Sequence, residues 1–402
     1  MKKAIISIIA VILATTAFYI VNNSKKDNPL RFASWGSQSE VKIIEETISD
    51  YELKSGKKIE FLHIPQNYFQ KIHLLFASSL EPDVIFFNNQ NIDLYIESDL
   101  LEDLTPYFPN VEKEYFKSSI DCFKRNQKLY AIPRDISNLV LYVNKDILKE
   151  QRVPYKGKFN SVEELINTAK ILTTKEHFGI NYEYNPLFWI YYLNANGGGI
   201  LADDTHTLLI NNKKSLEALN LYSDMANKYH IAPNKSQVGS MTTTQMFING
   251  KIAMLLSGRW LMPKFKETLD FNWDIAEFPS STENKVYVDS SGWAIAKKSK
   301  KKDEAIEFIK YLSSKEVSEK LAKDGLIVPA RIDVANEYIK DSIPHEKIFI
   351  TMLKNTKPTP VNKNYNRIND IIIEKTESVL SGEKRAEEVF DKKTQIKLES
   401  LL

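Results

Sequence analysis

The sequence predicts two α/β lobes, and three observations lead to this fold class. Short apolar runs alternate with longer segments in which apolar residues recur at helical spacing. The apolar run over residues 84–87 is typical of a buried parallel strand. The chain has 402 residues, 43% of them apolar and 26% charged. That length is enough for about two domains of roughly 150 residues each.

The alternation begins in the first part of the chain. Strands are predicted over residues 30–34 and 58–64, and an amphipathic helix follows each of them. The first helix has Ser39 near its start, and the apolar faces of the two helices carry Val41, Ile44, Ile48 and Tyr51, then Tyr68, Ile72, Leu75 and Phe76. With the strand at 84–87, this is the β-α-β-α-β order of a doubly wound sheet.

Similar elements recur later in the chain. Strands are predicted over 140–143, 252–256 and 293–296. A capping box of Ser161 and Glu164 precedes a helix, and the buried stripes of this and a later helix are Leu165, Ala169 and Leu172, then Ala305, Phe308, Ile309 and Leu312. The sequence has no glycine-rich or proline-rich linker and no internal repeat. We therefore expect the two lobes to be joined tightly, by more than one crossing of the chain.

Residues 1–28 are predicted to form a targeting segment. Two lysines precede an 18-residue apolar run over residues 4–21, and a polar stretch follows to Asn28. This pattern is typical of an export signal, with a poor cleavage site after Ala17. An uncleaved anchor in the inner membrane is the alternative, because 18 residues is just enough to cross a bilayer. No cysteine lies near the end of the run, which excludes a lipid-modified terminus, so we expect a periplasmic or other extracytoplasmic protein.

Composition and motifs exclude several classes of function. Lysine and arginine total 54 against 52 acidic residues, without the basic excess that nucleic-acid binding usually needs. The single cysteine, Cys122, allows no internal disulfide and is expected to be a buried apolar residue. The six histidines form no metal-binding pattern, so we expect no metal and no cofactor. The sequence has no nucleophile elbow, and we expect that the protein is not an enzyme. A glycosidase with an unidentified carboxylate pair is a distant alternative.

Polar side chains gather where predicted strands begin or end. In open α/β sheets, ligands bind beyond the carboxyl ends of the strands. The segments are 35–38, 88–90, 257–260, the stretch 133–138 between two strands, and 289–293 before a strand. Amides, hydroxyls, one Asp and an Arg beside indole rings suit the hydroxyl groups and the C–H faces of a sugar.

Several of these residues also have a purely structural interpretation. Trp35, Trp260 and Trp293 lie beside glycine and polar residues, so a ligand platform and a core position are about equally expected. Trp189 fits either role, and Trp273 is assigned to the core. Asp135 and Arg134 could form an ion pair that fixes a crossing between the lobes, without excluding contact with a ligand. The lysines over 297–302 indicate a solvent-exposed face. The glycines at 197–199 are weak evidence for a phosphate-binding loop, because no strand-to-helix context surrounds them.

Five segments in order carry a resemblance to a known family. They are EPDVIF at 81–86, LYAIP at 129–133, LYVNKD at 141–146, MFINGKIAM at 246–254 and SGWAI at 291–295. Because of these five segments, the chain resembles an extracytoplasmic solute-binding protein of a carbohydrate ABC importer. The resemblance extends from about residue 30 to the last residue. The resemblance is to the family 1 group that includes maltose-binding and glycerol-3-phosphate-binding proteins. Many of these relatives carry a lipid-anchoring cysteine that this chain lacks.

The resemblance implies a two-lobed periplasmic-binding-protein fold of type II, with discontinuous lobes, a hinge and a ligand cleft between them. The N-terminal lobe would comprise 29–134 with 292–328, and the C-terminal lobe 135–291 with 329–402. The crossings would lie near 131–138, 288–294 and 326–331. Carried over by position, the ligand-binding set is Trp35, Tyr68, Asn88, Asp135, Asn138, Trp189, Arg259, Trp260, Gly292, Trp293, Arg331 and Tyr365.

The function that the resemblance implies is capture of a sugar or an oligosaccharide, which closes the lobes, and delivery to a membrane permease. The partners would be the sugar and the ABC permease subunits, and we expect a monomer. One alternative is an acidic small molecule such as a glycerol phosphate ester, held by Arg134, Arg259 or Arg331 as forked donors. The exact sugar is not specified by the sequence.

Overall fold

The computed structural model describes residues 28–280, 285–323, 325–339 and 345–402. The predicted leader and its cleavage point after Ala17 lie outside the described residues, apart from Asn28. Within these ranges, no helix is both long enough and apolar enough to cross a membrane. The chain packs as two units, which are here called unit 1 (the described part of Met1–Ile85, with Ser299–Tyr311) and unit 2 (Phe86–Lys298, with Leu312–Leu402). The lobe boundaries predicted from the sequence remain a prediction.

Unit 1 is built around strand β1 (Leu30–Ser34). β1 pairs in parallel with β2 (Ile59–His63) and with the first residues of β3 (Val84–Asn88). The chain passes between these strands through helices α2 (Gln38–Ser55) and α3 (Tyr68–Ala77). The predicted β-α-β-α-β order is therefore confirmed, and the boundary between the units falls within β3, after Ile85.

Helix α14 (Lys302–Leu312) completes unit 1 from a distant part of the sequence. The ring of Phe308 lies 5.4 Å from the ring of Phe32 on β1 and 4.9 Å from that of Tyr51 on α2. Ser37 caps α2 in a capping box with Glu40, and Ser39 lies near the start of the helix, as predicted. This local cap starts α2, while the buried aromatic rings hold α2 and α14 against β1.

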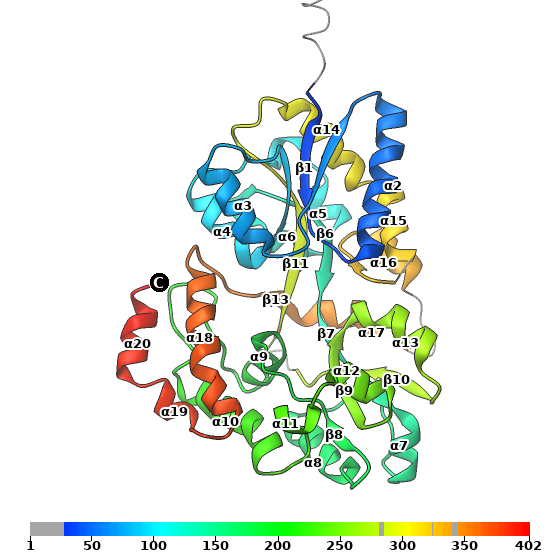
Figure 1. Cartoon of the computed structure of the whole chain (residues 1–402), viewed down its shortest axis with the longest axis vertical. Coiled ribbons are helices and arrows are strands. Elements are labelled where there is room, and N and C mark those ends of the chain that lie inside the picture. The colour runs from blue at the N-terminus through cyan, green and yellow to red at the C-terminus, as the bar shows by residue number, and fades with distance from the viewer. Residues whose placement is uncertain (1–27, 281–284, 324, 340–344) are drawn as a thin grey trace, which may run out of the picture. The chain divides into compact units, whose positions relative to one another are not determined.

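Unit 2 contains two sheets that one continuous stretch of chain connects (Figure 1). Strand β6 (Ile132–Ser137) pairs with β11 (Val286–Ile295) and β12 (Val328–Pro329), and β13 (Thr356–Pro358) pairs with β11. Only Asn138 separates β6 from β7 (Leu139–Asn144), which pairs with β9 (Ile252–Gly258) and β10 (Trp273–Ala276). Strand β8 (Phe178–Ile180) lies parallel to β9.

Two predicted strand boundaries are wrong. Residues 133–138 lie mostly in β6 itself and not between two strands, and 289–293 lie inside β11, which begins at Val286 and not at residue 293. The polar residues of both strands face a cavity, and this interrupts the apolar run by which a buried strand is recognised. A register shift between Ser291 and Gly292 further disturbs the alternation.

Helices surround the sheets of unit 2. Ser161 caps α8 (Val162–Leu172), whose buried stripe of Leu165, Ala169 and Leu172 is confirmed. The Glu164 carboxylate accepts from the N–H of Asn160 at 2.8 Å, and so does not close the predicted capping box. The other helices of unit 2 are α4 (Asn89–Glu97), η1 (Thr105–Tyr107), α5 (Val111–Glu114), α6 (Lys117–Asp121), α7 (Lys145–Glu150), α9 (Pro186–Ala195), α10 (Lys213–Asn227), α11 (Lys235–Val238), α12 (Thr243–Ile248), η2 (Arg259–Leu261), α13 (Met262–Thr268), α15 (Lys315–Lys323), α16 (Ile332–Tyr338), α17 (Ile348–Thr351), η3 (Met352–Asn355), α18 (Tyr365–Leu380), α19 (Ala386–Val389) and α20 (Lys392–Glu399). A short hairpin of β4 (Lys124–Arg125) and β5 (Lys128–Leu129) completes the unit.

Candidate functional site: a polar cavity in unit 2

Unit 2 contains a cavity of about 280 Å³ between β6, β11 and the starts of α4, α9 and α18. Its lining is rich in groups that form hydrogen bonds. The polar residues among those that line it are Asn88, Gln90, Asp135, Ser137, Asn185, Asp289, Ser290, Ser291, Thr359 and Asn369, together with Tyr191, Tyr287 and Tyr365. The cavity approaches the size of sites that bind small molecules, which measure about 300–1,000 Å³.

The carboxylate of Asp289 is held in place by two amide side chains. The Nδ2 atom of Asn89 donates to one carboxylate oxygen at 3.0 Å, and the Nε2 atom of Gln90 donates to the other at 2.9 Å. Asn89 is itself fixed, because its Oδ1 accepts from the N–H of Ser290 at 3.0 Å. Burial raises the pKa of Asp289, and the amide donors oppose this rise because they favour the ionised form.

The carboxylate of Asp135 is compensated by an arginine. Its Oδ2 accepts from Nε and from an Nη of Arg134, both at 2.6 Å, and its Oδ1 accepts from the N–H of Ser291 at 3.3 Å. The guanidinium carbon of Arg134 lies 4.2 Å from the centre of the Phe86 ring. The predicted ion pair between Arg134 and Asp135 is therefore present, and Asp135 still lines the cavity.

Three tyrosines add aromatic surface to the cavity. The hydroxyl of Tyr191 accepts from the N–H of Leu139 at 2.8 Å and donates to the carbonyl of Tyr287 at 3.3 Å. Tyr365 is the first residue of α18 and is buried, which raises the pKa of its hydroxyl. Fixed polar groups beside aromatic rings can bind hydroxyl groups and C–H faces of one ligand.

The structure places three of the predicted site residues in this cavity: Asn88, Asp135 and Tyr365. Asn88 also caps α4, because its Oδ1 accepts from the N–H of Asn91 at 3.1 Å. Two further predicted residues, Trp35 and Tyr68, belong to unit 1, where their ring centres are 4.8 Å apart.

Four predicted residues are packed in the interior of unit 2 and do not line the cavity. The indole of Trp189 is fully buried and donates to the carbonyl of Tyr184 at 3.3 Å, and the Trp293 ring lies 4.6 Å from the Phe86 ring. At Gly292, an added Cβ would lie 2.4 Å from the carbonyl oxygen of Ile132. Asn138 is buried and donates to the carbonyl of Phe349 at 3.1 Å. Ligand contact by any of the four would need a rearrangement of the core.

Arg259 and Trp260 follow β9 at a different place. The buried guanidinium of Arg259 donates to the carbonyl of Ile327 and pairs with Glu346 at 3.2 Å. Burial lowers the pKa of Arg259, and the carboxylate of Glu346 opposes this shift. Trp260 is 39% exposed and covers Gly258, where a Cβ would lie 1.9 Å from its ring. Neither side chain lines the cavity.

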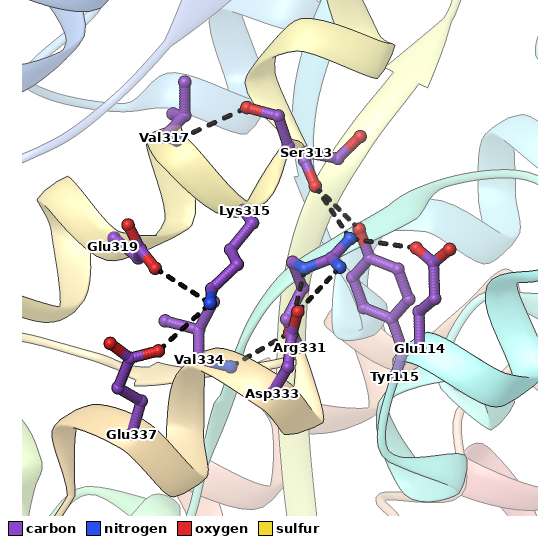
Figure 2. Close-up of polar contacts among 11 residues, drawn as sticks. Glu114, Tyr115, Ser313, Lys315, Val317, Glu319, Arg331, Asp333, Val334 and Glu337 are labelled. Carbon is purple, nitrogen blue, oxygen red and sulfur yellow. Dashed lines mark hydrogen bonds and ion pairs between the residues drawn. The ribbon is translucent and has the colours of Figure 1, made fainter.

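Arg331 is part of an ion-pair cluster (Figure 2). Its guanidinium pairs with Glu114 at 2.9 Å and with Asp333 at 3.0 Å. It also lies near the ring of Tyr115, whose hydroxyl donates to the carbonyl of Ser313 at 3.0 Å. This cluster joins α5, the start of α16 and the segment before α15, and it does not line the cavity.

The sequence pointed to some of the cavity residues only as parts of segments. Gln90 and Asp289 lie in the polar stretches 88–90 and 289–293, but the sequence did not distinguish them from their neighbours as site residues. Tyr191, Asn185 and Asn369 had no distinguishing signal, since each lies in or beside a helix of ordinary composition. The alternation over 286–289 places Tyr287 and Asp289 on one face of the strand and is the available signal for Asp289, although the two serines that follow obscure it.

The thiol of Cys122 and possible metal-binding groups are the reactive groups that the sequence raised. Cys122 is a buried free thiol, as the sequence predicted. Within the ranges that the structure describes, no group of three or more His, Cys, Asp and Glu side chains could hold a metal ion.

The sequence profile of the bacterial extracellular solute-binding proteins matches residues 46–346 of this chain. The match covers well over half of the chain, so the chain belongs to this family. It is a solute-binding protein and not an enzyme, as the sequence predicted. The family's description as extracellular also agrees with the expected location outside the cytoplasm.

One curated relative and two solved structures illustrate the similarity. The galactooligosaccharide-binding protein of Bacillus subtilis is 21% identical over 318 residues, which are 75% of this chain and 73% of the relative. The ABC substrate-binding protein Lmo0181 of Listeria monocytogenes, in complex with cycloalternan, has a TM-score of 0.82 at 24% identity, covering 92% of this chain and 98% of that one. UgpB of Mycobacterium tuberculosis, in complex with glycerophosphocholine, has a TM-score of 0.79 at 18% identity, covering 93% and 98%. These structures confirm the predicted solute-binding-protein fold.

Proposed function

We propose that this chain is the substrate-binding component of an ABC importer and that its substrate is a sugar or an oligosaccharide. The observation that carries the proposal is the cavity of unit 2, in which amides, carboxylates and hydroxyls lie beside three tyrosine rings. This combination suits a neutral ligand with many hydroxyl groups. Two relatives support the same class, since one is named for galactooligosaccharides and one was solved with cycloalternan.

The rest of the transport cycle is part of the same proposal. The sugar would be enclosed between two lobes, because only a closed form supplies the full set of contacts. The closed protein would then deliver the sugar to permease subunits in the membrane. The protein would act in the periplasm or a similar compartment, with residues 1–28 serving as a cleaved signal or as an anchor.

A glycerol phosphate ester is the less favoured substrate, although UgpB was solved with glycerophosphocholine. The three arginines that could bind a phosphate already pair with carboxylates: Arg134 with Asp135, Arg259 with Glu346, and Arg331 with Glu114 and Asp333. A phosphate would have to compete with these partners. These existing ion pairs disfavour a phosphate ester as the substrate.

A thermal-shift screen of the purified chain against sugars and glycerol phosphate esters tests the proposal. A ligand present at about 100 times its dissociation constant should stabilise the fold by about 2.7 kcal/mol, which raises the melting temperature by a few degrees. We expect such a shift with at least one neutral mono- or oligosaccharide. A shift with phosphate esters alone, or no shift with any sugar up to trisaccharides, would contradict the proposal.

A further inference from the structure

The lining of the cavity in unit 2 has an unequal charge distribution. Two carboxylates, Asp135 and Asp289, line it, and none of its lining residues in the described part of the chain is a lysine, an arginine or a histidine. The charge of Asp135 is offset by Arg134, which contacts it through two nitrogen atoms at 2.6 Å. The remaining charge on the wall is that of Asp289.

Asp289 has neutral partners only, as far as the described residues show. Its two oxygens accept from the side-chain amides of Asn89 and Gln90, and the hydroxyl of Thr359 also interacts with the carboxylate. No lysine or arginine in the described ranges forms an ion pair with it. These amides fix the carboxylate in position without cancelling its charge. Burial raises the pKa of Asp289, and the amide donors oppose that rise because they favour the ionised carboxylate. An ionised Asp289 gives a ligand in the cavity a fixed negative charge next to amide and hydroxyl groups.

We propose that Asp289 makes this cavity selective against anionic sugars, so that the transported substrate is a neutral sugar unit and not a sugar phosphate or a uronic acid. This inference rests on the proposed function and adds the charge class of the substrate. A like charge about 6 Å away, at an effective dielectric constant of about 20, lowers affinity on the order of a hundredfold. The hydroxyl groups of a neutral sugar can instead donate to the carboxylate.

Asp289→Asn is a sharp test, because it removes the charge and keeps the shape. The side chain of Gln90 can turn to accept from the new amide, while Asn89 keeps its donor to the remaining oxygen. Asp370→Asn is the matched control. Asp370 is exposed on α18 and does not line the cavity, so the same change of net charge occurs outside the site.

The experiment measures dissociation constants by calorimetry for the full chain and both variants. The probes are glucose, galactose and mannose with their 6-phosphates, and α-1,4-galactotriose with trigalacturonic acid as its acidic counterpart. Maltotriose is an additional neutral probe. For the wild type and Asp370→Asn, we expect a neutral probe to bind at least a hundredfold more tightly than its acidic counterpart. In Asp289→Asn, we expect this ratio to fall at least tenfold.

Two results would overturn the inference while leaving sugar binding intact. One is an acidic probe that binds the wild type within tenfold of its neutral counterpart. The other is an unchanged ratio in Asp289→Asn, which would place the discrimination elsewhere. If no sugar of either charge binds the wild type, the proposed function itself fails, and this inference fails with it.

Discussion

Three of the carboxylates in unit 2, those of Asp135, Asp289 and Asp93, are stabilised in different ways. Asp135 is paired with Arg134, and Asp289 is held by two amides. Asp93 on α4 is buried and pairs with Arg125 at 2.8 Å. Burial nevertheless raises the pKa of Asp93 to about 6, because the loss of hydration outweighs the attraction to the arginine.

Replacing Asp93 with Asn should therefore remove a pH-dependent part of the stability. The pKa is about 6 in the folded chain against an ordinary value of 3.8, so the folded state binds the extra proton between these values. The contribution of Asp93 to the free energy of unfolding is fully present below the lower pKa. It is lost as the pH rises through about 6, by up to ~3 kcal/mol.

Urea unfolding at several pH values from about 4 to 8 measures this effect. We expect Asp93→Asn to gain stability relative to the wild type as the pH rises through this window. Asp303→Asn, at an exposed position of α14, is the control, and its stability should follow the wild-type pH profile. A difference between Asp93→Asn and the wild type that stays constant over the window would contradict the assignment.

At the scale of elements, ion pairs connect segments that are distant in the sequence. The buried carboxylate of Glu346 pairs with Arg259, the first residue of η2, and also with Lys266 of α13. The exposed carboxylate of Glu337 on α16 pairs with Lys315 at 3.1 Å (Figure 2). The two pairs have similar chemistry but differ in burial, so they should contribute differently to stability.

Glu346→Gln should destabilise the protein by about 3 kcal/mol, because it leaves the buried guanidinium of Arg259 without its counter-charge. Glu337→Gln, the matched control at the exposed pair, should cost under about 1 kcal/mol. Urea unfolding of both variants at one pH gives the comparison. Equal losses in the two variants would show that the buried pair does not hold η2 and α13 to the segment before α17.

At the scale of the whole molecule, each unit is assembled from two separate stretches of the chain. Residues 299–311 return to unit 1, where the Phe308 ring packs between the rings of Phe32 and Tyr51. The single cysteine, Cys122, is fully buried in unit 2 next to α6. Burial raises the pKa of its thiol well above the ordinary value, so the reactive thiolate is scarce in the folded state.

Cys122 should therefore report the opening of unit 2. In native buffer near pH 8, we expect labelling by a disulfide reagent to be at least a thousandfold slower than in the chain unfolded by urea, because reaction needs rare opening. Labelling followed at increasing urea concentration, together with the loss of circular dichroism, gives the measurement. Labelling of the native protein at close to the unfolded rate would show that the thiol is accessible without unfolding.

Local sequence patterns were enough to predict the α/β class, the order of strands and helices in unit 1, the apolar faces of helices such as α8, and the family. These features depend on residues close together in the chain, through periodicity, caps and ordered motifs. It also predicted Asn88, Asp135 and Tyr365, which the structure brings together in one cavity. Asn88 and Asp135 lie in polar segments beside predicted strands, whereas Tyr365 was implied only by the family resemblance.

Which polar and aromatic groups face the cavity depends on packing between distant parts of the chain, and the structure is needed to show it. The structure places Trp189 and Trp293 in the core, although their neighbours resemble those of a ligand platform, and it commits Arg259 and Arg331 to carboxylates far away in the sequence. It also selects Asp289 within β11, a strand whose polar face concealed it. The physical reason is that a side chain is available to a ligand only if long-range packing and pairing leave it exposed, and those partners are not encoded in the local pattern.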